Sequence, residues 1–112
     1  MMILENFKQK DSIIKEIGKE YKKTKFFCSG AYFICEEESI YLRENKSIQY
    51  YKELKDKVDY ILMQLDEELA KVIFNEYLSK KVDNWWMYYY SKSTFYRLKN
   101  KAMNHFLEWW YV

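Results

Sequence analysis

The stretch that decides the fold is YYSKSTFYRLKNKA, Tyr89–Ala102, in a chain of 112 residues. Two aromatic residues open it, and Lys92, Arg97, Lys99 and Lys101 then follow with no acid among them. Hydroxyl residues stand where the basic run begins, and such side chains favour the first positions of a helix because they accept hydrogen bonds from its free N–H groups. The stretch therefore predicts a basic helix that begins at serines.

Residues 92–110 form an amphipathic pattern at 100° per residue, with Ser91 as the N-cap. The predicted inner face consists of Phe95, Leu98, Ala102, Phe106 and Trp109, with Lys99 and His105 at its margins. The predicted outer face consists of Ser93, Tyr96, Arg97, Asn100, Lys101 and Asn104. Asn and Ser are poor formers of a helix interior, so helix propensity does not explain their place on the outer face.

The outer face carries the groups that contact nucleic acids. Asn can make a bidentate contact with adenine and Arg with guanine, and hydroxyl residues in a first helical turn suit a phosphate. We therefore predict a DNA-binding surface made of Lys92, Ser93, Thr94, Tyr96, Arg97, Asn100, Lys101 and Asn104. The alternative is the ordinary solvated face of a terminal helix.

The composition predicts a single domain, 1–112, of mainly α structure, since the chain has no proline, only two glycines and 49% hydrophobic residues. Further helices are expected at 2–23, 47–65 and 66–80, and a short helix of about two turns in VDNWWMYYY, 82–90. The expected N-caps are Ser47, with Asn45 competing, then Asp66, and Asp83 or Asn84.

Each of the three longer helices has an apolar stripe. The stripes consist of Leu4, Phe7, Ile14, Ile17 and Tyr21, of Tyr51, Leu54, Val58, Ile61 and Leu65, and of Leu69, Val72, Ile73 and Tyr77. The first two stripes are narrow seams that can pair within one chain or between two chains. An intramolecular core, an antiparallel hairpin and a dimer arm all remain open.

Residues 25–45 are rich in aromatic and β-branched residues, which favour extended structure over helix. The pair Ser29–Gly30 indicates a turn. A short hairpin at 25–43 and an irregular crossover are both compatible with this segment.

Several classes of function are excluded. A net charge of +2 is too small to indicate nucleic-acid binding over the whole surface of the protein. The charge is uneven, however, because residues 84–112 contain four bases and one acid, Glu108. Cys28 and Cys35 have no further ligand nearby, so we expect reduced thiols and no metal. His105 has no catalytic partner that the sequence reveals, and Glu36–Glu38 is expected to be a solvated turn. We expect a cytoplasmic protein without cofactor, membrane span or enzymatic activity.

The tryptophans are divided between core and surface. Trp85 and Trp109 are expected in the core, and Trp86 and Trp110 are expected to be partly exposed. Exposed aromatic residues indicate a protein interface, with stacking on single-stranded bases as the alternative.

The order helix, turn, short helix, turn, long helix is that of a helix-turn-helix unit. Residues 65–110 resemble region 4 of sigma-70-type factors and, more closely, the C-terminal part of phage ArpU/RinA-type transcription regulators and similar small mollicute proteins. The motif residues that carry the resemblance are Ser91, Ser93, Phe95, Tyr96, Arg97, Lys99 and Ala102.

The resemblance implies a transcriptional regulator that binds double-stranded DNA through a recognition helix at 92–110. Residues 65–112 would form the helix-turn-helix, and residues 1–64 a helical scaffold that could also hold a homodimer together. The second hypothesis is a protein–protein module that binds RNA polymerase or another partner through exposed Trp and Tyr residues, without binding DNA.

Overall fold

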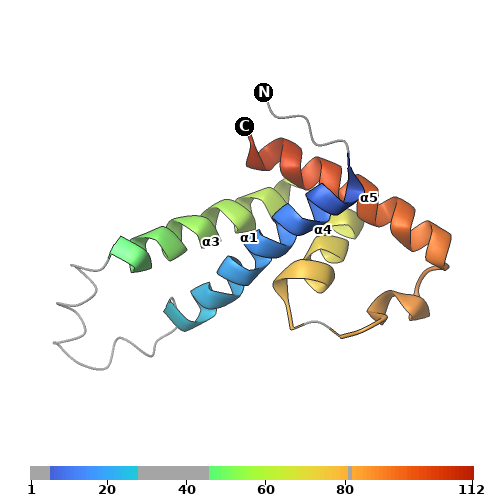
Figure 1. Cartoon of the computed structure of the whole chain (residues 1–112), viewed down its shortest axis with the longest axis horizontal. Coiled ribbons are helices and arrows are strands. Elements are labelled where there is room, and N and C mark those ends of the chain that lie inside the picture. Colours follow the sequence, from blue (N-terminus) through green and yellow to red (C-terminus); the bar gives the residue numbers. More distant parts are fainter. Residues whose placement is uncertain (1–5, 28–45, 81) are drawn as a thin grey trace.

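The computed structural model describes residues 6–27, 46–80 and 82–112, and every regular element within them is helical. The elements are α1 (Phe7–Phe27), α3 (Lys46–Gln64), α4 (Glu67–Ile73), the π-helical turn η2 (Phe74–Leu78), the 3-10 turn η3 (Trp85–Tyr88) and α5 (Lys92–Trp110). Figure 1 shows α1 and α3 side by side and antiparallel, with α5 crossing one end of the pair. The predicted mainly α fold is confirmed.

The pairing of α1 with α3 buries the two predicted seams inside one chain, apart from Leu4, which lies outside the described residues. Ile14, Ile17 and Tyr21 of α1 are buried, as are Leu54, Val58 and Ile61 of α3 and Leu65 just after it. Phe7 and Tyr51, at the ends of the two seams, are partly buried against the same core. The intramolecular core is therefore the arrangement that these seams adopt in the structure.

Helix α4 runs without a break into η2, in agreement with the helix expected at 66–80. Leu69, Val72, Ile73 and Tyr77 are all buried, as predicted. Asp66 is the residue before the helix, but its side chain makes no capping hydrogen bond. The last turn is wider than an α-helical turn, and its final backbone bond runs from the Ser79 amide to the Phe74 carbonyl at 2.9 Å.

Helix α5 has the predicted bounds and the predicted cap, since the Ser91 hydroxyl accepts a hydrogen bond from the Thr94 amide. Its buried face is rotated from the predicted one by roughly 60° at 100° per residue. The buried residues of α5 are Phe95, Lys99, Ala102, Met103, Phe106 and Leu107. The prediction that Trp109 lies in the core is wrong, because its side chain is exposed and meets the ring of Tyr60 edge-on at 6.0 Å.

The short helix expected in 82–90 is reduced to the four residues of η3. Asn84 precedes it with φ of 57°, a left-handed conformation that asparagine adopts more readily than most residues. Trp85 and Trp86 are both half-buried. Trp85 and Trp86 pack on Phe95, and no second full helix forms in this segment.

Two expectations about where the helices begin and end are wrong, and a third concerns residues that the structure does not describe. Phe26 and Phe27 were expected to be extended but belong to α1, which continues through them. Ser47 was expected to cap α3 but lies inside it, since α3 begins at Lys46. The rest of the expected hairpin at 25–43, with Cys28, Cys35, Glu36–Glu38 and the competing cap Asn45, falls outside the described residues.

Gly18 sets how closely α1 approaches η2. A Cβ at this position would overlap the backbone carbonyl oxygen of Tyr77, and this oxygen, unlike a flexible side-chain end, cannot rotate away. We expect Gly18→Ala to lower the free energy of unfolding by about 1–3 kcal/mol, because the cost of overpacking exceeds the gain of less than ~1 kcal/mol in helix propensity. Urea unfolding, monitored by tryptophan fluorescence, measures this change in the free energy of unfolding.

The matched control is Lys19→Ala, the neighbouring position on the exposed side of α1. It should change the free energy of unfolding by no more than about 0.5 kcal/mol. A Gly18→Ala variant as stable as the wild type would contradict the close contact between α1 and η2.

Candidate nucleic-acid interface

The outer surface of α5 presents two parallel rows of polar side chains. Residues four apart on a helix lie above one another, so Lys92, Tyr96, Asn100 and Asn104 form one row. The neighbouring row consists of Ser93, Arg97, Lys101 and His105. The two rows run along the helix and give a strip in which donors predominate.

Six of the eight predicted DNA-contacting residues are exposed: Lys92, Ser93, Tyr96, Arg97, Asn100 and Lys101. Thr94 and Asn104 are half-buried. The Thr94 hydroxyl also accepts a hydrogen bond of 2.9 Å from the Ser91 hydroxyl, so it takes part in the helix cap. The structure thus brings the predicted set together on one surface, with Thr94 and Asn104 at its edge.

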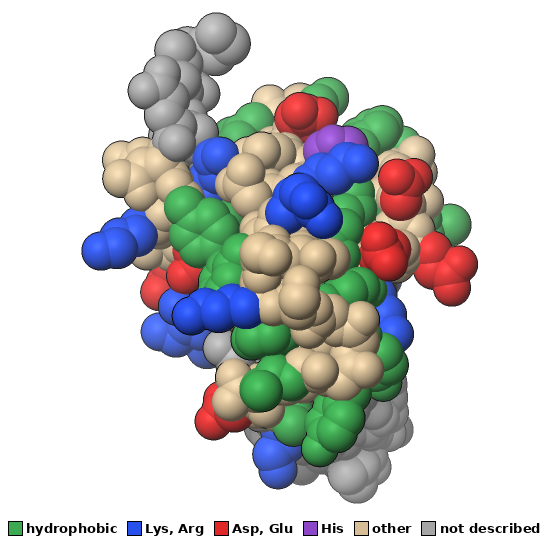
Figure 2. Space-filling view, turned by 90° about the vertical axis from the view of Figure 1, so that its right-hand side faces the viewer, with side chains coloured by type: hydrophobic (Ala, Val, Ile, Leu, Met, Phe, Trp, Pro, Cys, Tyr) green, Lys and Arg blue, Asp and Glu red, His purple; other side chains and the backbone are tan. Residues whose placement is uncertain are grey.

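The charge of the strip comes from three cations. Among the described residues, Lys92, Arg97 and Lys101 have no carboxylate within ion-pair distance. Glu108, the one acid of α5, is exposed near the far end of the helix. Figure 2 shows Lys and Arg side chains lying beside the single histidine, with hydrophobic side chains gathered below them on the same face.

Tyr96 joins the strip to the aromatic packing behind it. Its ring lies edge-on to Phe95 at 5.3 Å and to Trp86 at 6.3 Å, and it is 6.2 Å from the ring of Phe7 on α1. Trp86 in turn stacks on Phe95 at 4.7 Å with an angle of 7° between the rings. The first two turns of α5 are therefore fixed by ring contacts from both η3 and α1.

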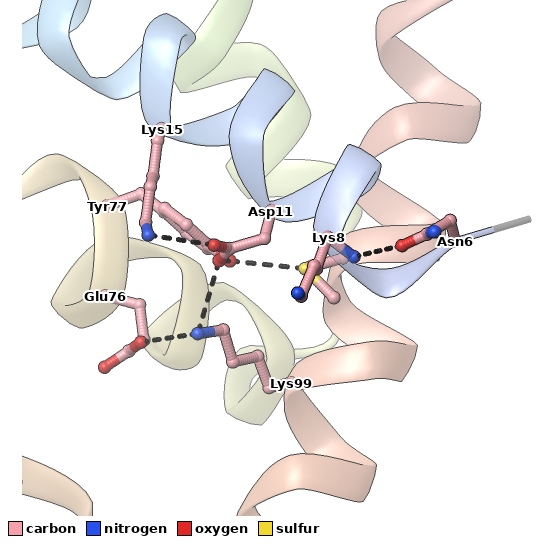
Figure 3. Close-up of polar contacts among 8 residues, drawn as sticks. Asn6, Lys8, Asp11, Lys15, Glu76, Tyr77 and Lys99 are labelled. Carbon is pink, nitrogen blue, oxygen red and sulfur yellow. Dashed lines mark hydrogen bonds and ion pairs between the residues drawn. The ribbon is translucent and has the colours of Figure 1, made fainter. Parts of the chain in front are cut away.

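The fourth base of the stretch, Lys99, does not belong to the strip. It is buried, and its ammonium nitrogen lies 2.9 Å from Oε2 of Glu76 and 3.4 Å from Oδ1 of Asp11 (Figure 3). The other oxygen of each carboxylate is also used: Lys15 lies 2.9 Å from Oδ2 of Asp11, and the Trp85 indole donates to Oε1 of Glu76 at 2.7 Å. The Tyr77 hydroxyl donates to Oδ1 of Asp11 at 2.6 Å. These contacts are called the buried ion network after its buried central pair, Glu76 and Lys99; its other members are Asp11, Tyr77, Trp85 and the exposed Lys15.

The buried ion network fixes the rotation of α5. Its members come from α1, η2, η3 and α5, and the Lys99 ammonium joins the Asp11 carboxylate of α1 to the Glu76 carboxylate of η2. If α5 turned by one residue, Lys99 would leave its place and the buried Glu76 carboxylate would lose its cation, which is costly. The same rotation would turn Arg97 and Lys101 away from the direction that they now face.

Sequence reasoning missed the buried ion network, although a signal was present. Glu76 follows Leu69 by seven residues and so lies on the buried face of its helix, while Lys99 lies between Phe95 and Ala102 on the buried face of α5. An acid and a base that each interrupt an apolar face predict a buried pair, since neither would be left unpaired. The sequence could not predict that Asp11 joins the network, because its contact with Lys99 depends on α1 crossing α5 in the tertiary structure.

The described residues contain no group of three or more His, Cys, Asp or Glu side chains placed to hold a metal ion. None of the helices in this part of the chain combines the length and apolar character needed to cross a bilayer. Comparisons with protein-family models, with curated proteins and with solved structures found no match to this chain.

We expect Lys99→Met to lower the free energy of unfolding by about 3–5 kcal/mol, because it leaves the buried Glu76 carboxylate without its cation and removes one of the two cations beside Asp11. The double variant Lys99→Met/Glu76→Gln should recover roughly 1–2 kcal/mol of that loss, since a neutral amide needs no cation and still accepts from the Trp85 indole. Denaturant unfolding of wild type, both single variants and the double variant measures the coupling.

The control for this cycle is Lys101→Met, which removes a lysine from the exposed side of the same helix. Its effect should stay within about 0.5 kcal/mol. Additive effects of Lys99→Met and Glu76→Gln would show that the two side chains do not interact.

The stability should also depend on Asp11 as the pH falls. Burial alone would raise the pKa of the Asp11 carboxyl, but hydrogen bonds from Tyr77 and Lys15 and the charges of Lys99 and Lys15 outweigh it, so the pKa lies below the ordinary 3.8. The stability conferred by ionised Asp11 is therefore present above pH 3.8 and is lost as the pH falls through the lowered pKa.

Asp11→Asn tests this dependence. The variant should be less stable than the wild type at neutral pH, and the gap should narrow as the pH falls from about 5 to about 2, because the wild-type carboxylate becomes protonated. Thermal unfolding of both proteins across this range measures the gap. A gap that stays constant would mean that the Asp11 carboxyl does not have a lowered pKa.

Proposed function

We propose that the protein binds double-stranded DNA through the exposed strip of α5 and acts as a transcriptional regulator. The observation that carries the proposal is that Arg97, Asn100 and Lys101 lie exposed together on one side of a helix whose opposite side is packed into the core. Such a helix can enter the major groove, which admits one α-helix and presents a distinct pattern of donors and acceptors for each base pair.

The strip divides into base-reading and phosphate-holding groups. Arg97 and Asn100 can make bidentate contacts with guanine and adenine, with Tyr96 and Ser93 beside them. Lys92 and Lys101 lie at the rims of the strip and would contact phosphate, as would Thr94 at the cap and Asn104, three residues beyond Lys101. Three cations make few phosphate contacts, so one molecule is expected to bind weakly and with a marked salt dependence.

The support of α5 differs from that of a regular helix-turn-helix. The second helix is represented by the single turn η3, and α5 is held from behind by α4, α1 and α3. The resemblance to sigma-70 region 4 supports the proposal through the motif of α5 itself. A homodimer would double the contacts and so raise the affinity.

A protein partner such as RNA polymerase is the second candidate function. It is favoured by an apolar patch at the other end of α5, where Tyr60, Met63 and Trp109 are exposed close to one another. Met63 follows Tyr60 by three residues on α3, and Trp109 meets Tyr60 edge-on. Such a patch suits a protein interface better than a phosphate backbone, since aromatic residues and Met are enriched at interfaces.

The DNA proposal is tested by titrating mixed-sequence duplex DNA with wild type and with Arg97→Ala/Lys101→Ala. We expect the double variant to bind at least about tenfold more weakly near 50 mM salt. Its slope of log affinity against log salt should be shallower by about 0.9, since Lys101→Ala removes one phosphate contact, whereas Arg97→Ala removes a base contact.

The matched control is Lys22→Ala/Lys52→Ala, which removes the same charge from exposed positions on α1 and α3. This control should bind DNA as the wild type does. The proposal fails if the wild type does not bind duplex DNA, or if both double variants lose affinity equally, because the latter would indicate only an effect of net charge.

A further inference from the structure

The face that carries the strip also carries an exposed aromatic turn. Tyr88 is the most exposed aromatic residue described, with 92% of its surface accessible, and Met87 and Tyr89 beside it are 62% and 61% exposed. Among the described residues no hydrogen bond or ring contact involves the Tyr88 side chain. Both faces of its ring are free, and nothing in the packing of the fold requires it.

The turn that presents Tyr88 is held in place by its neighbours. Trp86 stacks on Phe95 of α5, and the Tyr90 hydroxyl donates to Glu68 of α4 at 3.2 Å. Within the turn, the amides of Tyr89 and Tyr90 both donate to the Trp86 carbonyl at 2.9 Å. Tyr88 therefore projects from a turn that is anchored on both sides. Because the turn is already ordered, little conformational entropy of the backbone would be lost when the Tyr88 ring meets a ligand.

Charge distinguishes this aromatic turn from a purely apolar docking patch. Lys92 follows Tyr88 by four residues and is exposed, and Arg97 lies one turn further along α5. Figure 2 shows the hydrophobic side chains and the Lys and Arg side chains on one face of the molecule. Asp83, exposed before the turn, would repel phosphate, so a bound backbone is expected to pass on the α5 side.

We propose that Tyr88 stacks on an unpaired base, so that the protein prefers DNA in which a single-stranded segment adjoins a duplex. Aromatic rings beside a cationic groove are the elements with which proteins hold single strands, since every base offers a flat face. A tyrosine cannot stack in this way on a base that remains paired within a continuous duplex, because both faces of that base are covered by its neighbours. This inference rests on the proposed DNA binding by α5 and specifies the form of DNA that is preferred.

The test compares three labelled DNAs: a blunt duplex, the same duplex with a single-stranded overhang, and the overhang strand alone. We expect the wild type to bind the overhanging duplex at least about fivefold more tightly than the blunt one, which is the size of effect that one stacked base contributes. Tyr88→Ala should lose this preference, because it removes the stacking ring. Tyr88→Phe should keep it, because the stacking ring is retained. An overhang with 2-aminopurine should lose fluorescence on binding wild type but not Tyr88→Ala.

The matched control is Tyr111→Ala, which removes an exposed tyrosine at the opposite end of α5 and should leave the preference unchanged. Equal binding of blunt and overhanging duplexes by the wild type, or a preference that survives Tyr88→Ala, overturns the inference and leaves the turn to a protein partner. In that case, loss of blunt-duplex binding in Arg97→Ala/Lys101→Ala would still support DNA binding by α5. Absence of all DNA binding would end both proposals.

Discussion

The arrangement of this protein depends on one buried ammonium group. Lys99 lies between the carboxylates of Glu76 and Asp11, and through them it connects the last helix to η2 and to the first helix. Burying these charges gives little net stability, but losing any one of them is expensive, so the network selects one arrangement among several that would bury similar apolar area. Burial and the hydrogen bond to Asp11 also raise the pKa of the Tyr77 hydroxyl far above its ordinary value, so it remains a donor to that carboxylate.

Two features of the backbone bring these groups together. The absence of a Cβ at Gly18 lets α1 lie directly against the Tyr77 carbonyl, and the wide turn η2 places Glu76, Tyr77 and Leu78 in succession toward the interior. A regular α-helix would turn one of three consecutive residues further outward. Wide turns of this kind often mark sites under a special constraint, and the constraint here is the meeting of three helical segments at Lys99.

The direction of the exposed strip of α5 follows from this interior. Because Lys99, Phe95 and Phe106 fix the inner side of α5, its outer side presents Arg97, Asn100 and Lys101 in a set direction. The aromatic turn before α5 is anchored by the stack of Trp86 on Phe95, so the cations and the free ring of Tyr88 are both held by the same core residues. The strip and the aromatic turn are therefore held next to each other by contacts with the same residue, Phe95.

The sequence by itself determined the helical class, the bounds of α5 and its serine cap, and the polar composition of its outer side. These depend on local periodicity and capping, which act over a few residues. Tertiary structure decided which flank of α5 is covered: it buried Met103 and Leu107, left Trp109 exposed, and placed Lys99 inside. Helical periodicity gives the direction of an apolar face only approximately. The crossing of α1 and the carboxylates of Asp11 and Glu76 decide the final rotation, because a buried charge must meet its partner.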